Sequence, residues 1–560
     1  DPDDSYYLRQ EKHGLILGPY EWRATPHWPD GELPEDFANQ LYPDDLERLE
    51  WYIEQACARM PVLGSVGVQR VINGPIPYAP DGLPYVGPAY RMPNVFHCCG
   101  FSFGICQGGG AGKSVAEWIV DGKPEWDLWS LDPRRYGHYA DQAYVVERAV
   151  EVYQHEYAIH FPVQEWPAGR PRLTTPVYER LAAKGARFGA RGGWERATWF
   201  PRPNDPAEES AGYARGVWFE AVGEECRHVR DRAGILAIGG FTKLRLEGEG
   251  AAAWLDTLIA GRLPRVGRVS LAYLCAPSGG VWSELTLTRL GDERFVLVGG
   301  ALAKRHDIQW LEEHLPPEAD FALEDVTEDY ATLVVAGPDS REILAELTEA
   351  DLSNGAFPWL ACREIEVAGT ALLAQRVNYV GELGWELHVP VAAEIALYDA
   401  LMRTGEPYGL RDVGMYAMDS MRLEKSYRGW KTELDHTLSP LASGLGRFVD
   451  TSKEADFVGK AALAAEAAAG PTDSFVTLVL EADDTDAFFG CPLHHQGEVV
   501  GMTTSGGYGH RVEASLALGY VRTALAVPGT ALEVELLGER VAARVIEESP
   551  YDPSNERLRG

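Results

Sequence analysis

The sequence lacks the patterns that mark metal-bound, disulfide-linked and membrane-spanning proteins. Its 560 residues include eight cysteines, and no two of them form a C-x-x-C pair. A zinc site or a disulfide framework is therefore not expected, and a reducing compartment is the default. No apolar run approaches the roughly 20 residues that a membrane helix needs, and no charged-then-apolar signal segment opens the chain. We expect a cytoplasmic protein with no metal site and no membrane partner.

Basic residues are also scarce. The chain has 51 Lys and Arg against 84 Asp and Glu, which gives a formal net charge of -33. Binding to a nucleic acid relies on basic side chains that displace counterions from phosphates. We therefore expect no nucleic-acid partner, and the negative charge is consistent with a soluble protein.

The length is too great for one hydrophobic core and predicts two to four domains. From Phe241 onward, short apolar strands alternate with helices, for example over 295–298 and 304–314. An Ala-rich helix at 461–469 ends at Gly470-Pro471. The segment 475–548 is rich in strands separated by glycine turns, which predicts a small β-barrel or sandwich. The fold class is therefore α+β or α/β with several domains.

The N-terminal part predicts a hairpin over 6–18, a helix over 44–60 and a turn-rich loop that contains Gly82. The strand 94–100 leads into Gly108, Gly109 and Gly110, which we interpret as a strand-to-helix turn before a helix over 112–120. This arrangement resembles the C-terminal part of flavoproteins of the D-amino-acid oxidase superfamily. The resemblance implies that these four glycines lie against FAD.

The other half of an FAD site is missing from the sequence. A G-x-G-x-x-G turn after an N-terminal strand would anchor the ADP moiety, and the chain has none. We expect the chain to be a fragment that binds FAD only when an upstream half is supplied. The resemblance makes Tyr7, on the first strand, a candidate for the substrate face. A tyrosine packed in a strand core is an equally good interpretation.

A glycine-rich segment at 376–387 carries Tyr379 and Glu386 in the order R-x-x-Y-x-G-E-x-G-x-E. It resembles the folate-binding segment of glycine-cleavage T-protein-like aminomethyltransferases. One carboxylate can accept two parallel N–H groups from a pterin. The resemblance therefore implies that Glu386 binds the pterin and that Tyr379 lines the folate site. An exposed hairpin with solvated charges is the alternative.

Two further segments match the same family. Glu284, in Gly279-Gly280-Val-Trp-Ser-Glu-Leu, stands where the family has an aspartate that assists one-carbon transfer, so we take it as the catalytic carboxylate. Arg422, in a segment similar to S-L-R-L-E-K-x-Y-R, is implied to bind folate. An ion pair of Arg422 with Glu424 or Asp419 is the structural alternative.

The order of these parts resembles the dimethylglycine and sarcosine dehydrogenase family. The predicted parts are the end of a flavin domain, a connector, a T-protein-like folate domain and its barrel, over residues 1–130, 131–190, 191–469 and 473–556. The resemblance implies oxidative N-demethylation of a small N-methyl amino acid, with transfer of the one-carbon unit to tetrahydrofolate. The electron acceptor would be oxygen or an electron-transfer flavoprotein. A free-standing folate-dependent aminomethyltransferase and a non-catalytic regulatory relative are the alternatives.

Overall fold

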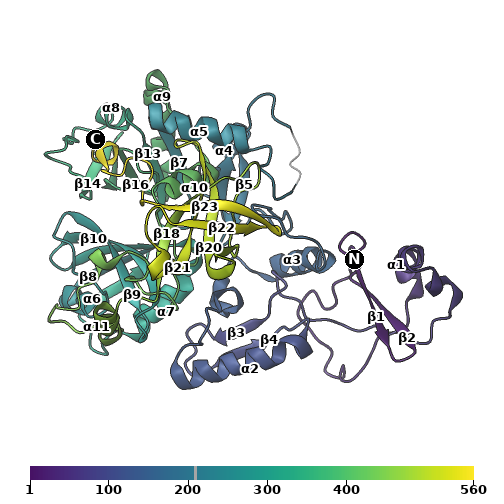
Figure 1. The fold of residues 1–560 in the computed structure, drawn as a ribbon. Helices are drawn as coiled ribbons and strands as arrows, with labels where there is room; N and C mark the ends of the chain where they lie inside the picture. The colour runs from purple at the N-terminus through teal and green to yellow at the C-terminus, as the bar shows by residue number, and fades with distance from the viewer. Residues whose placement is uncertain (207–210) are drawn as a thin grey trace. The chain divides into compact units, whose positions relative to one another are not determined.

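The computed structural model describes residues 1–206 and 211–560 of the chain (Figure 1). The chain divides into two compact units, Asp1–Arg172 and Leu173–Gly560. The division falls within the segment 131–190 that the sequence predicts as a connector. No helix in the described residues is long and apolar enough to cross a membrane.

The first unit opens with the predicted hairpin. Its two-residue turn is Lys12-His13, with Glu11 paired to Gly14, and Lys12 adopts a positive φ of 52°. The predicted helix over 44–60 is also confirmed, and Asp45 caps it by accepting a hydrogen bond from the backbone N–H of Arg48. The elements of this unit are β1 (Tyr6–Glu11), β2 (Gly14–Pro19), α1 (Leu46–Arg59), β3 (Tyr85–Pro88), β4 (Phe96–Cys99), α2 (Gly104–Asp121) and α3 (Gln142–Gln154).

The glycine cluster lies inside a helix, so the predicted strand-to-helix turn at 108–110 is wrong. The turn is at 100–103, and α2 starts at Gly104 and continues through Gly108, Gly109 and Gly110. Interior helical N–H groups donate to carbonyls one turn back, so these three cannot form an anion cradle. A Cβ placed on any of the three would meet no atom within 4 Å. These three glycines instead lie exposed on the surface of α2, where no side chain covers the backbone.

Within the described residues, the second unit contains two large, mainly antiparallel sheets, a two-stranded hairpin and a barrel (Figure 1). The first sheet has the order β12-β8-β11-β10-β9. Its strands are β8 (Thr242–Gly248), β9 (Arg268–Cys275), β10 (Val281–Gly291), β11 (Arg294–Gly299) and β12 (Phe321–Asp325). In the sequence, the helix α6 (Ala251–Asp256) lies between β8 and β9, and the helix α7 (Lys304–Glu313) lies between β11 and β12.

The second sheet has the order β14-β15-β16-β13-β7-β17. Its strands are β7 (Gly234–Ile238), β13 (Tyr330–Ala336), β14 (Cys362–Val367), β15 (Thr370–Gln375), β16 (Gly384–Pro390) and β17 (Arg411–Asp412). The helices near it in sequence are α4 (Tyr178–Ala183), α5 (Phe219–Asp231), α8 (Ser340–Ala345), α9 (Glu394–Gly405) and α10 (Met415–Glu424), and the hairpin β5 (Arg187–Arg191) and β6 (Trp194–Trp199) precedes it. Alternate residues of β13 and β16, such as Leu333, Trp385 and Leu387, belong to one buried core.

The C-terminal segment forms a closed barrel in the order β18-β21-β20-β19-β22-β23. It follows α11 (Lys460–Ala469) and comprises β18 (Asp473–Leu480), β19 (Pro492–His495), β20 (Glu498–Gly509), β21 (Ala514–Arg522), β22 (Ala531–Leu536) and β23 (Glu539–Ile546), after which α12 (Glu556–Arg559) ends the chain. Closure removes free strand edges. The predicted barrel is thus confirmed, as is a fold of several α+β domains.

Candidate functional site

Glu386 lies on the face of β16 that is turned away from the hydrophobic core. Its neighbours Trp385 and Leu387 are buried in that core, so the alternation of the strand places Glu386 and His388 together on the opposite face. The Glu386 side chain is only 16% exposed. Burial raises the pKa of this carboxyl to about 7, although nearby Lys243 opposes the shift.

Lys243 on β8 is the positive charge that acts on the pKa of Glu386. No sequence motif identifies this lysine. Its side chain is buried, and its ammonium donates to the carbonyls of Tyr330 at 2.8 Å and Phe241 at 3.3 Å. Burial, followed by the charge of Arg196, lowers the pKa of Lys243 to about 8. One carboxyl and one amine with shifted pKa values therefore lie close together, a pattern typical of functional sites.

Glu284 on β10 lies directly opposite Tyr273 on β9. The Tyr273 hydroxyl donates to a carboxylate oxygen of Glu284 at 2.7 Å. Burial raises the pKa of Glu284 to about 7, with the tyrosine lowering it and Glu433 raising it further. A carboxyl that titrates near neutral pH can both donate and accept a proton.

Tyr379 lies in the loop between β15 and β16. Its hydroxyl donates to the carbonyl of Arg428 at 2.6 Å, and its ring centroid is 5.5 Å from that of Tyr427. The loop is shaped by Asn378, whose side-chain oxygen accepts the backbone N–H groups of Val380 and Gly381. The tyrosine is thus held by the backbone around it.

Arg422 on α10 is buried and bonded to other protein groups. Its guanidinium donates to Asp419 at 2.7 Å, to Glu433 at 3.0 Å and to the carbonyl of Tyr427 at 3.2 Å. Burial alone would lower the pKa of Arg422, but the two carboxylates raise it above its ordinary value. The ion pair with Asp419 that the sequence offers as an alternative is present. A direct contact of Arg422 with folate remains a prediction.

The structure brings three of the four predicted folate-module residues into one neighbourhood. Glu284, Arg422 and Glu433 all influence the pKa of Tyr379 electrostatically. Glu433, which sequence reasoning missed, also accepts from Ser505 at 2.5 Å and from the backbone of Gly429 at 2.8 Å. Glu386 is instead influenced by Lys243, which comes from the other sheet.

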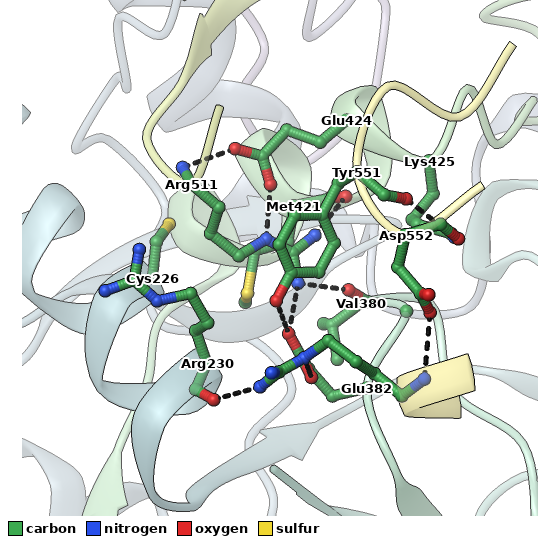
Figure 2. A network of polar contacts seen from close by, with 12 residues as sticks. Cys226, Arg230, Val380, Glu382, Met421, Glu424, Lys425, Arg511, Tyr551 and Asp552 are labelled. Carbon is green, nitrogen blue, oxygen red and sulfur yellow. Dashed lines mark hydrogen bonds and ion pairs between the residues drawn. The ribbon is translucent and has the colours of Figure 1, made fainter. Parts of the chain in front are cut away.

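A buried ionic network holds the loop that carries Tyr379 (Figure 2). Arg511, in the turn after β20, is fully buried and donates to Glu424 on α10, to Glu382 at 2.9 Å and to the carbonyls of Val380 and Met421 at 2.9 Å each. Figure 2 shows Tyr551 beside Glu382, to which its hydroxyl donates at 2.7 Å. The loop between β15 and β16 is therefore fixed to α10, to the barrel and to the C-terminal segment.

The first unit holds the residues predicted to contact flavin and substrate. Tyr7 on β1 is 38% exposed, and its ring lies over Gly18, where a Cβ would meet it at 2.1 Å. Gly82 adopts a positive φ of 73° in a loop anchored by Arg135, which donates to Asp81 at 2.7 and 3.0 Å. Because Gly108 to Gly110 lie inside α2, their predicted role at FAD would be steric, allowing close approach. These roles remain predictions.

Comparison with known proteins relates each part of the chain to a described family. Four family descriptions match in chain order: "FAD dependent oxidoreductase" over 1–118, "FAD dependent oxidoreductase central domain" over 121–175, "GCVT N-terminal domain" over 177–453 and "Glycine cleavage T-protein C-terminal barrel domain" over 474–552. These matches support FAD and tetrahydrofolate as the cofactors of such a chain.

Relatives match along the full length of the chain. Human mitochondrial dimethylglycine dehydrogenase is 37% identical and human mitochondrial sarcosine dehydrogenase 33%, over 100% of this chain and 65% and 66% of theirs. A formaldehyde-forming 4-methylaminobutanoate oxidase of Paenarthrobacter nicotinovorans is 31% identical over 100% of this chain and 68% of its own. The chain thus spans about two thirds of the length of these relatives.

A solved structure resembles the second unit. The aminomethyltransferase of the glycine cleavage system from Bartonella henselae aligns with a TM-score of 0.59 and 26% identity, over 68% of this chain and 98% of that protein. The predicted cytoplasmic location gains no support from the two human relatives, whose names place them in mitochondria. The chain belongs to the dimethylglycine and sarcosine dehydrogenase family, in which FAD-dependent oxidoreductase sequence is joined to a glycine-cleavage T-protein module.

Proposed function

We propose that the second unit binds tetrahydrofolate and is the one-carbon acceptor half of an enzyme that oxidatively demethylates a small N-methyl amino acid. Tetrahydrofolate supplies the amine nitrogens that take up the one-carbon unit. The first unit is part of the FAD-dependent half, in which the amine is oxidised. Keeping both halves in one protein contains a reactive intermediate that water would otherwise release as formaldehyde.

The observation that carries this proposal is the position of Glu386. It is a carboxyl on a largely buried strand face, and this burial raises its pKa to about 7 while nearby Lys243 limits the shift. Such a carboxylate gains most from a ligand that donates two parallel N–H groups, which the edge of a pterin does. Lys243, protonated below its pKa of about 8, favours the ionised form.

Glu284 is the residue that we assign to proton transfer. With a pKa of about 7 it can take up or release a proton near neutral pH. Tyr273 fixes one of its oxygens by donating a hydrogen bond at 2.7 Å, and we propose that the other oxygen takes part in the proton transfer. Glutamate places this carboxylate one methylene farther from its strand than the aspartate of T-proteins.

The substrate class follows from what the named relatives share. Dimethylglycine, sarcosine and 4-methylaminobutanoate are all N-methyl amines with a carboxylate. We propose a substrate of this class for this protein, with Tyr7 at the substrate face as a hydrogen-bonding phenol and with oxygen or an electron-transfer flavoprotein as electron acceptor. The glycines at 82 and 108–110 would contact FAD, whose pyrophosphate needs a dinucleotide-binding turn from an upstream segment.

Calorimetric titration of this chain with tetrahydrofolate tests the folate proposal. The wild-type protein should bind, and Glu386→Gln should weaken binding about tenfold or more, because a fork of charge-assisted hydrogen bonds is lost. Glu364→Gln is the control, since Glu364 lies exposed on β14 of the same sheet and pairs only with Arg294 at 2.6 Å among the contacts described. Absence of binding by the wild-type protein would overturn the proposal.

A free-standing aminomethyltransferase is the second candidate. It is favoured by one observation, the alignment of 68% of this chain with 98% of an aminomethyltransferase of the glycine cleavage system. The two candidates differ in what they predict when a dinucleotide-binding segment is supplied: flavin binding and amine oxidation are expected only for the first.

A further inference from the structure

Gln375, the last residue of β15, is a buried polar side chain without an internal partner. It is completely inaccessible, and within the described residues neither the oxygen nor the nitrogen of its amide has a hydrogen-bond partner. An unsatisfied buried amide is costly, and native proteins keep few of them. A side chain of this kind beside a candidate ligand site indicates a group that pairs with the ligand.

The register of the sheet places this amide next to Glu386. Gln375 pairs directly with Glu386 across β15 and β16. Their chain neighbours Ala374 and Trp385 both point into the hydrophobic core, so Gln375 and Glu386 share the opposite face. Directly opposed residues of antiparallel strands have Cβ atoms about 4.5–5.5 Å apart. The two side chains are therefore adjacent groups on one surface.

The hydrogen-bonding pattern of a pterin explains why both groups would be needed. Its pyrimidine edge presents the 2-amino group and N3–H as donors, followed by the 4-oxo group as an acceptor. Glu386 can accept from both donors, but an ionised carboxylate has no proton to donate to the oxygen. The amide of Gln375 can donate to it.

The other polar groups near this face are not placed directly opposite Glu386, although the Nε2 of His388 is also buried without a hydrogen-bond partner in the described residues. Lys243 already donates to two backbone carbonyls. His388 has a ring nitrogen 3.8 Å from Glu386, and burial holds its pKa at about 3, so the ring is neutral. Its other ring nitrogen is 3.4 Å from the hydroxyl of Thr332. Gln375 is thus the side chain that the strand register places directly beside the carboxylate of Glu386.

We propose that Gln375 is a specificity-determining residue of the folate site, whose amide N–H donates to the 4-oxo group of the pterin while Glu386 accepts from N3–H and the 2-amino group. This inference rests on the proposed folate-binding function and goes beyond it, because it names the group that pairs with the 4-oxo oxygen of the pterin.

The test compares the affinities of the whole chain for tetrahydrofolate and for its 4-amino-4-deoxy analogue. Gln375→Glu keeps the size of the side chain but turns the donor into an acceptor, which suits a 4-amino group. The ratio of the two dissociation constants should shift toward the analogue by about tenfold or more. Glu386 is present in every protein compared, so its own preference cancels from the change in the ratio.

Two further variants keep the result interpretable. Gln375→Met has no polar group, so it should lose about tenfold in affinity for tetrahydrofolate and the part of the discrimination that Gln375 supplies. Gln309→Met is the control, because Gln309 is also buried but lies on α7 and donates to Glu313 at 2.7 Å. If Gln375→Glu does not fold, judged by circular dichroism, the Gln375→Met result decides.

The outcomes separate the two proposals. Binding of tetrahydrofolate by the wild-type chain, with a ratio that Gln375→Glu and Gln375→Met leave within about twofold, would overturn the role of Gln375 and leave the folate function intact. Failure of the wild-type chain to bind tetrahydrofolate would overturn both. A shifted ratio in the Gln375 variants, with none in Gln309→Met, supports both.

Discussion

Lys243 on β8 and Glu386 on β16 come from different sheets and shift each other's ionisation. The amine helps the carboxyl to ionise, and the carboxyl helps the amine to keep its proton, while burial opposes both charges. The pair therefore marks the place where the two sheets of the second unit meet around a polar region.

Tetrahydrofolate affinity should rise with pH through neutrality. Glu386 has a pKa of about 7 in the folded protein, so below that pH it is protonated and must lose a proton before it can accept two N–H groups. Affinity should then fall by up to about tenfold for each pH unit below 7. Calorimetry between about pH 6 and pH 8 measures this. The dependence should be absent in Glu386→Gln, and its persistence there would assign it to another group, such as Glu284.

Glu284→Gln should impair one-carbon transfer while leaving binding in place. The amide keeps the shape of the side chain but cannot exchange a proton, so the enzyme-dependent condensation of formaldehyde with tetrahydrofolate should slow by about 100-fold or more. Stopped-flow absorbance follows this reaction after subtraction of the uncatalysed rate. Affinity for tetrahydrofolate should stay within about threefold of wild type. An unchanged rate would remove Glu284 from the reaction.

Arg511→Met should strongly destabilise the second unit. It leaves Glu424 and Glu382 buried without their main partner, and breaking a buried ion pair costs about 3–5 kcal/mol. Arg540→Met is the control, because Arg540 and its partner Glu533 are both exposed and such pairs contribute about 1 kcal/mol or less. Urea unfolding followed by tryptophan fluorescence compares them. Equal midpoints would show that the network contributes little.

Gly381→Ala should lower the free energy of unfolding by more than the penalty for placing alanine at a positive φ. Gly381 and Gly369 both have φ of 77°, so alanine pays a similar backbone penalty of about 1–2 kcal/mol at each. A Cβ at Gly369 would meet nothing within 4 Å, whereas at Gly381 it would lie 2.5 Å from the Lys425 side chain. We expect an additional loss of about 1–3 kcal/mol in Gly381→Ala, measured by thermal unfolding of both variants. Equal losses would mean that Lys425 moves aside freely.

The sequence predicts best those features that depend on nearby residues. The segment with Tyr379 and Glu386 is recognisable because its glycines, acid and tyrosine lie within a dozen residues, and the barrel is recognisable because its strands and turns alternate regularly. Lys243, Glu433 and Arg511 carry no such signal. Their contacts join residues that are far apart in the chain, and a lone lysine, glutamate or arginine is usually a surface charge.

The glycines of α2 show that a clear local signal in the sequence can also give a wrong prediction. Glycine disfavours helix interiors by up to about 1 kcal/mol per residue, so a run of glycines predicts a turn. The helix nevertheless extends to Asp121, where Gly122 in the left-handed conformation ends it, and Ala111 and Ser114 face inward from its middle. The helix thus continues through the three glycines although only Ala111 and Ser114 of its residues are buried, and the local preference of these glycines does not decide its structure.

The ionic network around Arg511 also bears on how this protein could be divided or recombined. The sequence suggests a cut near Gly470-Pro471, which would treat the barrel as a cassette that can be exchanged between homologues. Yet Arg511, in the turn after β20, neutralises carboxylates of the folate domain. A chimera joined there would leave buried charges without partners in both of its parts. A donor barrel would be accepted only together with carboxylates that match Glu382 and Glu424, so an exchange between homologues should carry these two residues along with the barrel.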